Sequence, residues 1–281
     1  IVEASHAWRS DLVVKVKELQ DEELERLPMR RALFGFQHLP HEPQRTRALV
    51  AREATAIAFE MVRDAGGGFP LLAPMSVIAG RMAIDVARSH MRRPVRNVVV
   101  LGAGNAGMAA AQAASECGAD VTILRRANAT PQAISEAVQQ ADLVVGAVFV
   151  PASPTPKLVP RSLVRRMRPG SMIVDISIDA GGVAETSRPT SHADPTYVEE
   201  GVIHYAVANM PAARPAEAAA ALWRAAIPFV EEMARKGIGP AVRDNGALRA
   251  GVLLWRGRAC HAGIAAEAGV PCVPLVREEL S

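Results

Sequence analysis

Three glycines near the middle of the chain, Gly102, Gly104 and Gly107, have the spacing Gly-x-Gly-x-x-Gly. They follow an apolar run at residues 98–101 and begin an alanine-rich segment. In such a turn the first glycine lets the chain reverse, the second lets backbone N–H groups approach a pyrophosphate, and the third lets the helix pack closely on the strand. The phosphate then lies at the positive end of the helix dipole. The pattern predicts a dinucleotide-binding turn with contacts from Gly102, Gly104, Asn105, Ala106 and Gly107.

The position after the next apolar run, residues 121–124, bears on the choice between NAD and NADP. An acidic residue there would accept hydrogen bonds from the ribose 2′-hydroxyl of NAD. This chain has Arg125 and Arg126 instead. Because a guanidinium pairs with a 2′-phosphate, Arg125 favours NADP. The alternative is that both arginines are solvated loop charges.

Ionisable side chains also occur at or near the ends of predicted strands. His38 ends one of them, and sheet proteins often keep catalytic side chains at such ends. Lys15 and Lys17 share one face of another strand, because side chains alternate with a period of two. Each of these residues could equally be structural: a histidine within an apolar strand or a solvated lysine face. Asp175 and Asp179 could both be loop caps.

Composition limits the class of protein. The 281 residues are enough for two domains, and 49% of them are hydrophobic without any run long enough to span a bilayer. The formal net charge of +3 is small and dispersed, so neither nucleic acid nor a membrane is an expected partner. Cys117, Cys260 and Cys272 lack ligand-like spacing, which argues against a metal site and fits a reduced, cytoplasmic compartment.

Strand and helix patterns alternate along most of the chain, which predicts an α/β fold with a parallel, doubly wound Rossmann-type sheet. The expected strands are 12–17, 32–38, 55–61, 98–101, 121–124, 141–148, 171–179 and 202–208. The expected helices are 21–30, 42–54, 72–91, 131–140, 161–167, 215–236 and the tail 244–269. We expect a dinucleotide-binding domain at 71–213 and a second, discontinuous α/β substrate domain at 1–70 plus 214–281.

Between Arg126 and Pro131 there is no room for the usual second crossover helix and third strand of a Rossmann-type sheet. Either that half of the sheet is reduced or residues are absent. The first residue, Ile1, is not methionine, and the substrate domain is expected to be truncated at its N-terminus.

Several motifs together resemble the alanine dehydrogenase branch of the alanine dehydrogenase and pyridine-nucleotide transhydrogenase family. They are DLVVKVKE, FQHL, LLAPMSVIAGR, VVVLGAGNAG, ADLVVGAVFVP, PKLVPRSLVRRMRPGSMIVDISIDAGG and ETSRPTSHADPTYVEEGVIHYAVANMP. The resemblance implies a substrate domain and a dinucleotide domain with the active site between them, in a homo-oligomer that is usually a hexamer.

The resemblance also implies residue roles. Lys17 matches the lysine that binds the substrate carboxylate, His38 the general acid/base, and Asp179 the carboxylate near the nicotinamide. Further cofactor contacts are expected from Ser76, Val148, Asn209 and Met210.

The chain departs from the family pattern at several positions. The N-terminal segment with an arginine that clamps the substrate carboxylate does not precede Ile1, and a glycine-rich loop before the dinucleotide strand is missing. Val77 replaces a glutamate, and the stretch from Pro215 lacks the usual serines and threonines.

The expected function is an NAD(P)-dependent amino-acid dehydrogenase that interconverts L-alanine, or a related amino acid, with its 2-oxo acid and ammonia. The alternatives are a reductase of a different oxo acid or imine, a dinucleotide-binding protein without turnover, and a transhydrogenase subunit.

Overall fold

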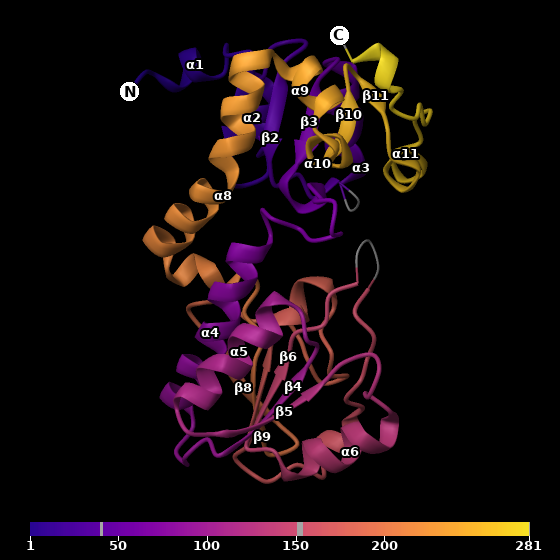
Figure 1. Cartoon of the computed structure of the whole chain (residues 1–281). Helices are drawn as coiled ribbons and strands as arrows, with labels where there is room; N and C mark the ends of the chain where they lie inside the picture. Colours follow the sequence, from indigo (N-terminus) through magenta and orange to yellow (C-terminus); the bar gives the residue numbers. More distant parts are fainter. Residues whose placement is uncertain (40–41, 151–153, 281) are drawn as a thin grey trace. The chain divides into compact units, whose positions relative to one another are not determined.

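The computed structural model describes residues 1–39, 42–150 and 154–280 (Figure 1). The chain forms two compact units, of which unit 1 is Ile1–Leu72 with Leu222–Ser281 and unit 2 is Ala73–Ala221. The second boundary lies inside helix α8 (Pro215–Lys236), because one continuous helix leaves unit 2 and enters unit 1. From the sequence, that boundary was expected before the helix, between residues 213 and 214.

Unit 2 contains a six-stranded sheet in the order β5-β4-β6-β7-β9-β8. Its strands are β4 (Asn97–Leu101), β5 (Asp120–Leu124), β6 (Leu143–Gly146), β7 (Met172–Asp175), β8 (Thr196–Glu199) and β9 (Val202–Tyr205). All neighbours pair in parallel except β8, which is antiparallel to β9. The doubly wound parallel sheet predicted from the sequence is confirmed.

The apolar runs of β4, β6 and β7 are buried on both faces. Val98 and Val100 of β4 face a core that includes α4 (Ala73–His90) and α5 (Asn105–Glu116). Val99 and Leu101 face a second core that includes α6 (Pro131–Gln140) and α7 (Arg161–Val164). Burial on both faces explains why the strands show continuous apolar runs and no alternation of polar and apolar residues.

Strand β5 is the edge of this sheet, so the half beyond it is reduced. The chain after β5 turns directly into α6. Asn128 closes this turn, because its side-chain oxygen accepts from the backbone N–H of Arg125 at 2.7 Å. The short connection between Arg126 and Pro131 is therefore explained by a sheet that ends at β5.

Unit 1 contains a five-stranded sheet in the order β1-β2-β3-β10-β11. Its parallel part is β1 (Leu12–Lys15), β2 (Ala32–Gly35) and β3 (Thr55–Ala58), and β10 (Val252–Trp255) and β11 (Arg258–Ala259) are antiparallel. The helices are α1 (Ala4–Ala7), α2 (Asp21–Arg26), α3 (Pro43–Ala51), η2 (Phe59–Met61), the end of α8, α9 (Ile238–Asp244), α10 (Gly246–Ala250), α11 (Ala262–Ala268) and η5 (Arg277–Glu279). No helix in the described ranges is long and apolar enough to cross a membrane.

The expectation of a helical tail over 244–269 is wrong, because this segment contains β10 and β11. Val252–Trp255 pairs with β3, and the hairpin turns through Arg256 and Gly257, both with positive φ. Two consecutive residues with positive φ are typical of the tight turns that join antiparallel strands. The apolar residues of this tail complete the sheet of unit 1 and do not form one helix.

Most strands are shorter at their carboxyl ends than the apolar patterns predict. Strand β1 ends at Lys15, β2 at Gly35, β3 at Ala58 and β7 at Asp175. The chain continues in apolar residues after each of these ends, but it has already left the sheet. Consequently Lys17, His38 and Asp179 lie in the turns that follow the strands.

Candidate functional site

The glycine turn of unit 2 is shaped by close backbone packing. Gly102 has a φ of +109°, and a Cβ built on Gly107 would lie 1.9 Å from the carbonyl oxygen of Gly102. A Cβ on Gly104, in contrast, would meet no atom within 4 Å. Among the described residues no side chain caps α5, which begins directly after Gly104. These residues fit a dinucleotide pyrophosphate, which needs a close approach to the backbone at a helix N-terminus.

Helix α4 packs unusually closely on α5 near this turn. A Cβ on Gly80 would lie 2.1 Å from the carbonyl oxygen of Ala106, so only glycine permits the contact. Ser76, one turn earlier, is half-buried. The neighbouring Val77 lines a groove of about 540 Å³ together with Asn105 and Met108. The sequence analysis missed Gly80, although a lone glycine within a helix is a recognised sign of close packing.

Arg125 lies at the end of β5 and is exposed. Its backbone N–H is held by Asn128. Within the described residues its guanidinium forms no hydrogen bond or ion pair. The group is therefore available to an anionic ligand near the end of β5, the neighbour of the strand that carries the glycine turn.

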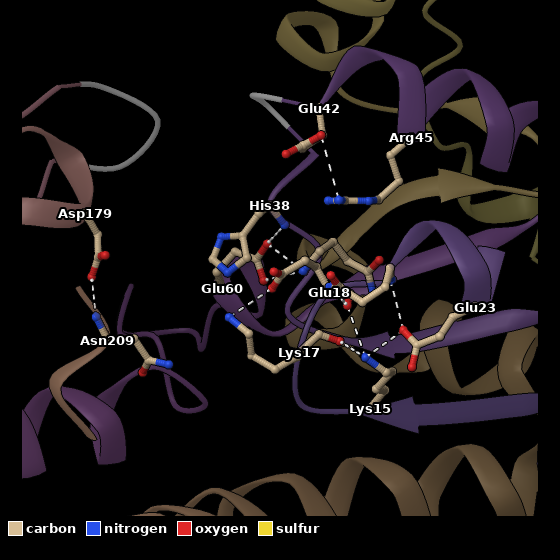
Figure 2. Close-up of polar contacts among 12 residues, drawn as sticks. Lys15, Lys17, Glu18, Glu23, His38, Glu42, Arg45, Glu60, Asp179 and Asn209 are labelled. Carbon is tan, nitrogen blue, oxygen red and sulfur yellow. Dashed lines mark hydrogen bonds and ion pairs between the residues drawn. The ribbon is translucent and has the colours of Figure 1, made fainter. Parts of the chain in front are cut away.

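Asp179 and Asn209 lie close together in unit 2. Asp179 belongs to the 3-10 helix η3 (Ile176–Ala180), which directly follows β7. The backbone N–H of Asn209 donates to Oδ2 of Asp179 at 3.5 Å (Figure 2). Asn209 has a φ of 52° and precedes η4 (Met210–Ala213). The side chain of Met210 is 2% exposed and lies in the core, so its backbone is the part that could contact a ligand.

Two further side chains hold the turns at this edge of the sheet. The hydroxyl of Ser177 accepts from the N–H of Val148 and donates to the carbonyl of Val148, both at 2.9 Å. The buried carboxylate of Asp175 accepts from the N–H of Val183 at 2.8 Å and from the hydroxyl of Ser187 at 2.6 Å. Burial raises the pKa of Asp175, and these hydrogen bonds offset part of that effect. Asp175 therefore caps the loop that follows Asp179.

Lys17 lies in the turn after β1 of unit 1, with 59% of its side chain exposed. Its ammonium forms an ion pair with Oε2 of Glu18 at 3.2 Å. Burial of Glu18 disfavours its charged form, but its own backbone N–H and Lys17 outweigh this and hold its pKa below the ordinary value. His38 also favours the charged form of Glu18. Lys17, Glu18 and His38 thus form one cluster of charges (Figure 2).

Lys15 points in a different direction from Lys17, which corrects the expectation that both lie on one strand face. Its ammonium donates to the carbonyl oxygens of Lys17 and Glu18, each at 3.1 Å. It also forms an ion pair with Glu23 at 3.0 Å. Lys15 therefore closes the turn that carries Lys17, while Lys17 faces solvent.

His38 is exposed, and its backbone has a φ of 50°. Its N–H donates to Oε1 of Glu60 at 2.8 Å, and the N–H of Gln37 donates to the same oxygen at 3.0 Å. The imidazole stacks on the ring of Phe36, with 5.9 Å between centroids. Glu60, in the 3-10 helix after β3, was not identified from the sequence, because an isolated glutamate in a turn gives no local signal.

The candidate residues therefore form two groups. Lys17 and His38 lie near Glu18 in unit 1, and the glycine turn, Asp179 and Asn209 belong to unit 2 (Figure 2). In the described part of the chain no group of three histidine, cysteine, aspartate or glutamate side chains could hold a metal ion.

Family models match both units. The model described as "Alanine dehydrogenase/PNT, N-terminal domain" matches residues 1–79, and the model described as "Alanine dehydrogenase/PNT, C-terminal domain" matches residues 124–262.

Two relatives from bacteria cover most of the chain. An alanine dehydrogenase of Halomonas elongata is 39% identical over 298 positions, which cover 94% of this chain and 80% of the relative. An alanine dehydrogenase of Staphylococcus haemolyticus is 38% identical, covering 96% of this chain and 82% of the relative. The first alignment is longer than the 281 residues of this chain, so the relative has internal segments that have no counterpart here.

Solved structures agree with these matches. An L-alanine dehydrogenase superposes with a TM-score of 0.87 at 36% identity, covering 95% of this chain and 83% of the other. A transhydrogenase from Sinorhizobium meliloti superposes with a TM-score of 0.81 at 20% identity, covering 91% and 83%, and shares the fold.

Proposed function

We propose an amino-acid dehydrogenase function for this chain, which belongs to the alanine dehydrogenase and pyridine-nucleotide transhydrogenase family. The reaction converts L-alanine, or a close analogue, together with oxidised cofactor and water, into the 2-oxo acid, ammonium, reduced cofactor and a proton. The observation that carries this proposal is the 39% identity, over 94% of the chain, to a protein named alanine dehydrogenase.

We assign substrate binding to residues 1–70 plus 214–281, and cofactor binding to residues 71–213. A nicotinamide cofactor bound by these residues would supply the acceptor for the hydride that leaves Cα of the amino acid. Gly102, Gly104, Asn105, Ala106 and Gly107 would hold its pyrophosphate, with further contacts from Ser76, Val148, Asn209 and Met210. The open space beside Gly104 supports this assignment.

Three side chains of this protein then bind the substrate, stabilise developing charge and transfer protons. The ammonium of Lys17 binds the substrate carboxylate and stabilises negative charge on the oxygen that becomes the carbonyl. The imidazole of His38 takes protons from the substrate amine and from the attacking water, a role that histidine performs most often among side chains. The carboxylate of Asp179 stabilises the positive charge that develops on the substrate carbon and nitrogen.

The assay is spectrophotometric. Purified protein is mixed with NAD or NADP and a panel of L-amino acids, and the absorbance of the reduced cofactor is followed. We expect turnover with L-alanine or a close analogue. Turnover only in the reductive direction with another oxo acid or imine would favour the specialised reductase. Micromolar cofactor binding without turnover of any substrate would refute the dehydrogenase.

We further propose that the cofactor is NADP, because Arg125 stands where an acidic ribose ligand would favour NAD. In Arg125→Asp we expect NADP to bind at least tenfold more weakly and NAD to bind no worse. Isothermal titration gives both dissociation constants, and Arg126→Asp is the control with the same change of charge one residue away. Tighter binding of NAD than of NADP by the unaltered protein would contradict this proposal, as would unchanged NADP affinity in Arg125→Asp.

The proposed assembly is a homo-oligomer, a hexamer by family resemblance, and the proposed location is the cytoplasm. In the described part of the chain the three cysteines form no disulfide, which supports a reducing compartment. Light scattering coupled to size-exclusion chromatography measures the number of chains in the assembly. A monomer at micromolar concentration would exclude the oligomer, and cell fractionation tests the location.

A further inference from the structure

The carboxylate of Glu60 binds two consecutive backbone amides. Its Oε1 accepts from Gln37 at 3.0 Å and from His38 at 2.8 Å, and its Oε2 lies 3.3 Å from the Gln37 nitrogen (Figure 2). Consecutive N–H groups that converge in a turn form a concave site suited to an anion. Here the carboxylate of a side chain from the same unit occupies that site.

The backbone held in this way is strained. His38 has a φ of 50°, in the left-handed region that few residues other than glycine occupy, although asparagine, aspartate and histidine do so more often than the rest. Such a conformation persists only where the surroundings enforce it, and it is concentrated at functional sites. The two hydrogen bonds to Oε1 of Glu60 fix the amides of Gln37 and His38 in this conformation.

The sheet brings Glu60 to this turn. Strands β2 and β3 are parallel neighbours, with Gly35 opposite Ala58 at their carboxyl ends. The chain leaves both strands at the same edge, so η2 lies beside the turn of His38. Phe36 also fixes the imidazole, because it stacks on His38 and packs edge-on against Phe59 at 5.4 Å. Backbone and ring of His38 are therefore held from the same two turns.

We propose that Glu60 is a positioning residue: it holds His38 in the orientation that proton transfer requires, and its carboxylate performs no proton transfer itself. The role rests on the proposed function of His38. Because Oε1 accepts both N–H groups, a glutamine at this position could keep both hydrogen bonds. This property separates positioning from acid–base catalysis or charge stabilisation, in which glutamine could not replace glutamate.

The test compares three variants. Glu60→Leu removes the acceptor, and we expect kcat for amino-acid oxidation to fall about 100-fold, the scale of an ångström-sized misplacement. Glu60→Gln is expected to stay within about fivefold of the unaltered protein, because the oxygen acceptor remains. Glu53→Leu is the matched control, because Glu53 pairs with exposed Arg30 in the same unit, and it should stay within about twofold.

Two further measurements test whether Glu60 acts on the reaction through His38. In a His38→Ala background, Glu60→Leu should change the residual rate less than about threefold, since residues that act as one unit are not additive. Hydrogen exchange followed by mass spectrometry should show at least tenfold faster exchange of the Gln37 and His38 amides in Glu60→Leu, and no change there in Glu53→Leu.

Three results would overturn the proposal: an equal loss in Glu60→Gln and Glu60→Leu, an equal loss with and without His38, or unchanged amide exchange in Glu60→Leu. If Glu60→Leu does not fold, Glu60→Gln decides, and a loss above about tenfold counts against positioning. The exchange measurement needs no substrate, so it tests the hydrogen bonds from Gln37 and His38 to Glu60 even if the unaltered protein turns over no amino acid. Absence of turnover would refute the proposed function alone.

Discussion

At the scale of single residues, the buried histidine of unit 2 differs in role from the exposed His38. His204 is 1% exposed, and its Nδ1 lies 3.0 Å from the carbonyl oxygen of Val202. Because a carbonyl can only accept, Nδ1 carries the hydrogen, and in the neutral ring Nε2 accepts from the hydroxyl of Thr186 at 2.7 Å. Tyr197 stacks on the ring at 5.0 Å. This histidine is a structural group of the sheet.

The first prediction concerns the pH dependence contributed by His204. Burial lowers its pKa below the ordinary value of 6.5, so the unfolded chain takes up a proton at a higher pH than the folded one. Its contribution to stability is complete above pH 6.5 and is lost as the pH falls below that value, by up to about 1.4 kcal/mol per pH unit. Urea unfolding followed by circular dichroism between pH 7 and 5 measures the loss.

His204→Gln should remove this share of the pH dependence, because glutamine does not titrate. Asp175 contributes with the opposite sign, since its raised pKa stabilises the folded state as the pH falls. The difference between the unaltered protein and His204→Gln cancels the contribution of Asp175. His192→Gln, at an exposed position in the same unit, is the control. Identical pH slopes in the unaltered protein and His204→Gln would disprove the assignment.

At the scale of elements, the turns after the strands determine where the candidate groups lie. Lys15 ends β1 and makes three contacts with the next turn: two carbonyl oxygens and Glu23 of α2. Glu23 also accepts from the N–H of Gln20 in a capping box at the start of α2. The turn that carries Lys17 is thus closed between the end of one strand and the start of the next helix.

The second prediction follows from these contacts. Lys15→Met keeps the length of the side chain but removes its hydrogen bonds to two carbonyl groups and its ion pair with Glu23. We expect the free energy of unfolding to fall by about 1–3 kcal/mol. If Lys17 binds the substrate carboxylate, KM for the 2-oxo acid should rise about tenfold while the cofactor affinity stays unchanged. Lys236→Met, which removes an ion pair to Glu232 on α8, is the control and should leave KM unchanged.

Sequence could predict the elements whose signals are local. The glycine turn and the parallel sheet of unit 2 follow from spacing and apolar runs within a short stretch. Strands β10 and β11 could not be predicted in this way, because Val252–Trp255 becomes a strand by pairing with β3, far away in the sequence. For the same reason Glu60 was not recognised as the partner of His38. Their contact exists only once β2 and β3 lie side by side.

At the scale of the whole molecule, each unit has a core of its own. Unit 1 is built around the core that contains Leu33, Ala56 and Leu254, and unit 2 around two cores on the faces of its sheet. All three tryptophans, Trp8, Trp223 and Trp255, belong to unit 1. Fluorescence excited at a wavelength that selects tryptophan therefore reports on unit 1, whereas far-ultraviolet circular dichroism reports on both units.

The last prediction uses this separation. Because chains with two cores need not unfold in one step, we expect the fluorescence and circular dichroism transitions in guanidinium chloride to differ. A cofactor at 100 times its dissociation constant should stabilise the unit that binds it by about 2.7 kcal/mol. If unit 2 holds the cofactor, the part of the circular dichroism change that does not coincide with fluorescence moves to higher denaturant, while the tryptophan transition stays in place, at fixed protein concentration. Gly107→Ala, which places a Cβ against the carbonyl of Gly102, should abolish that shift. Coincident transitions that move together would show that the two units unfold as one.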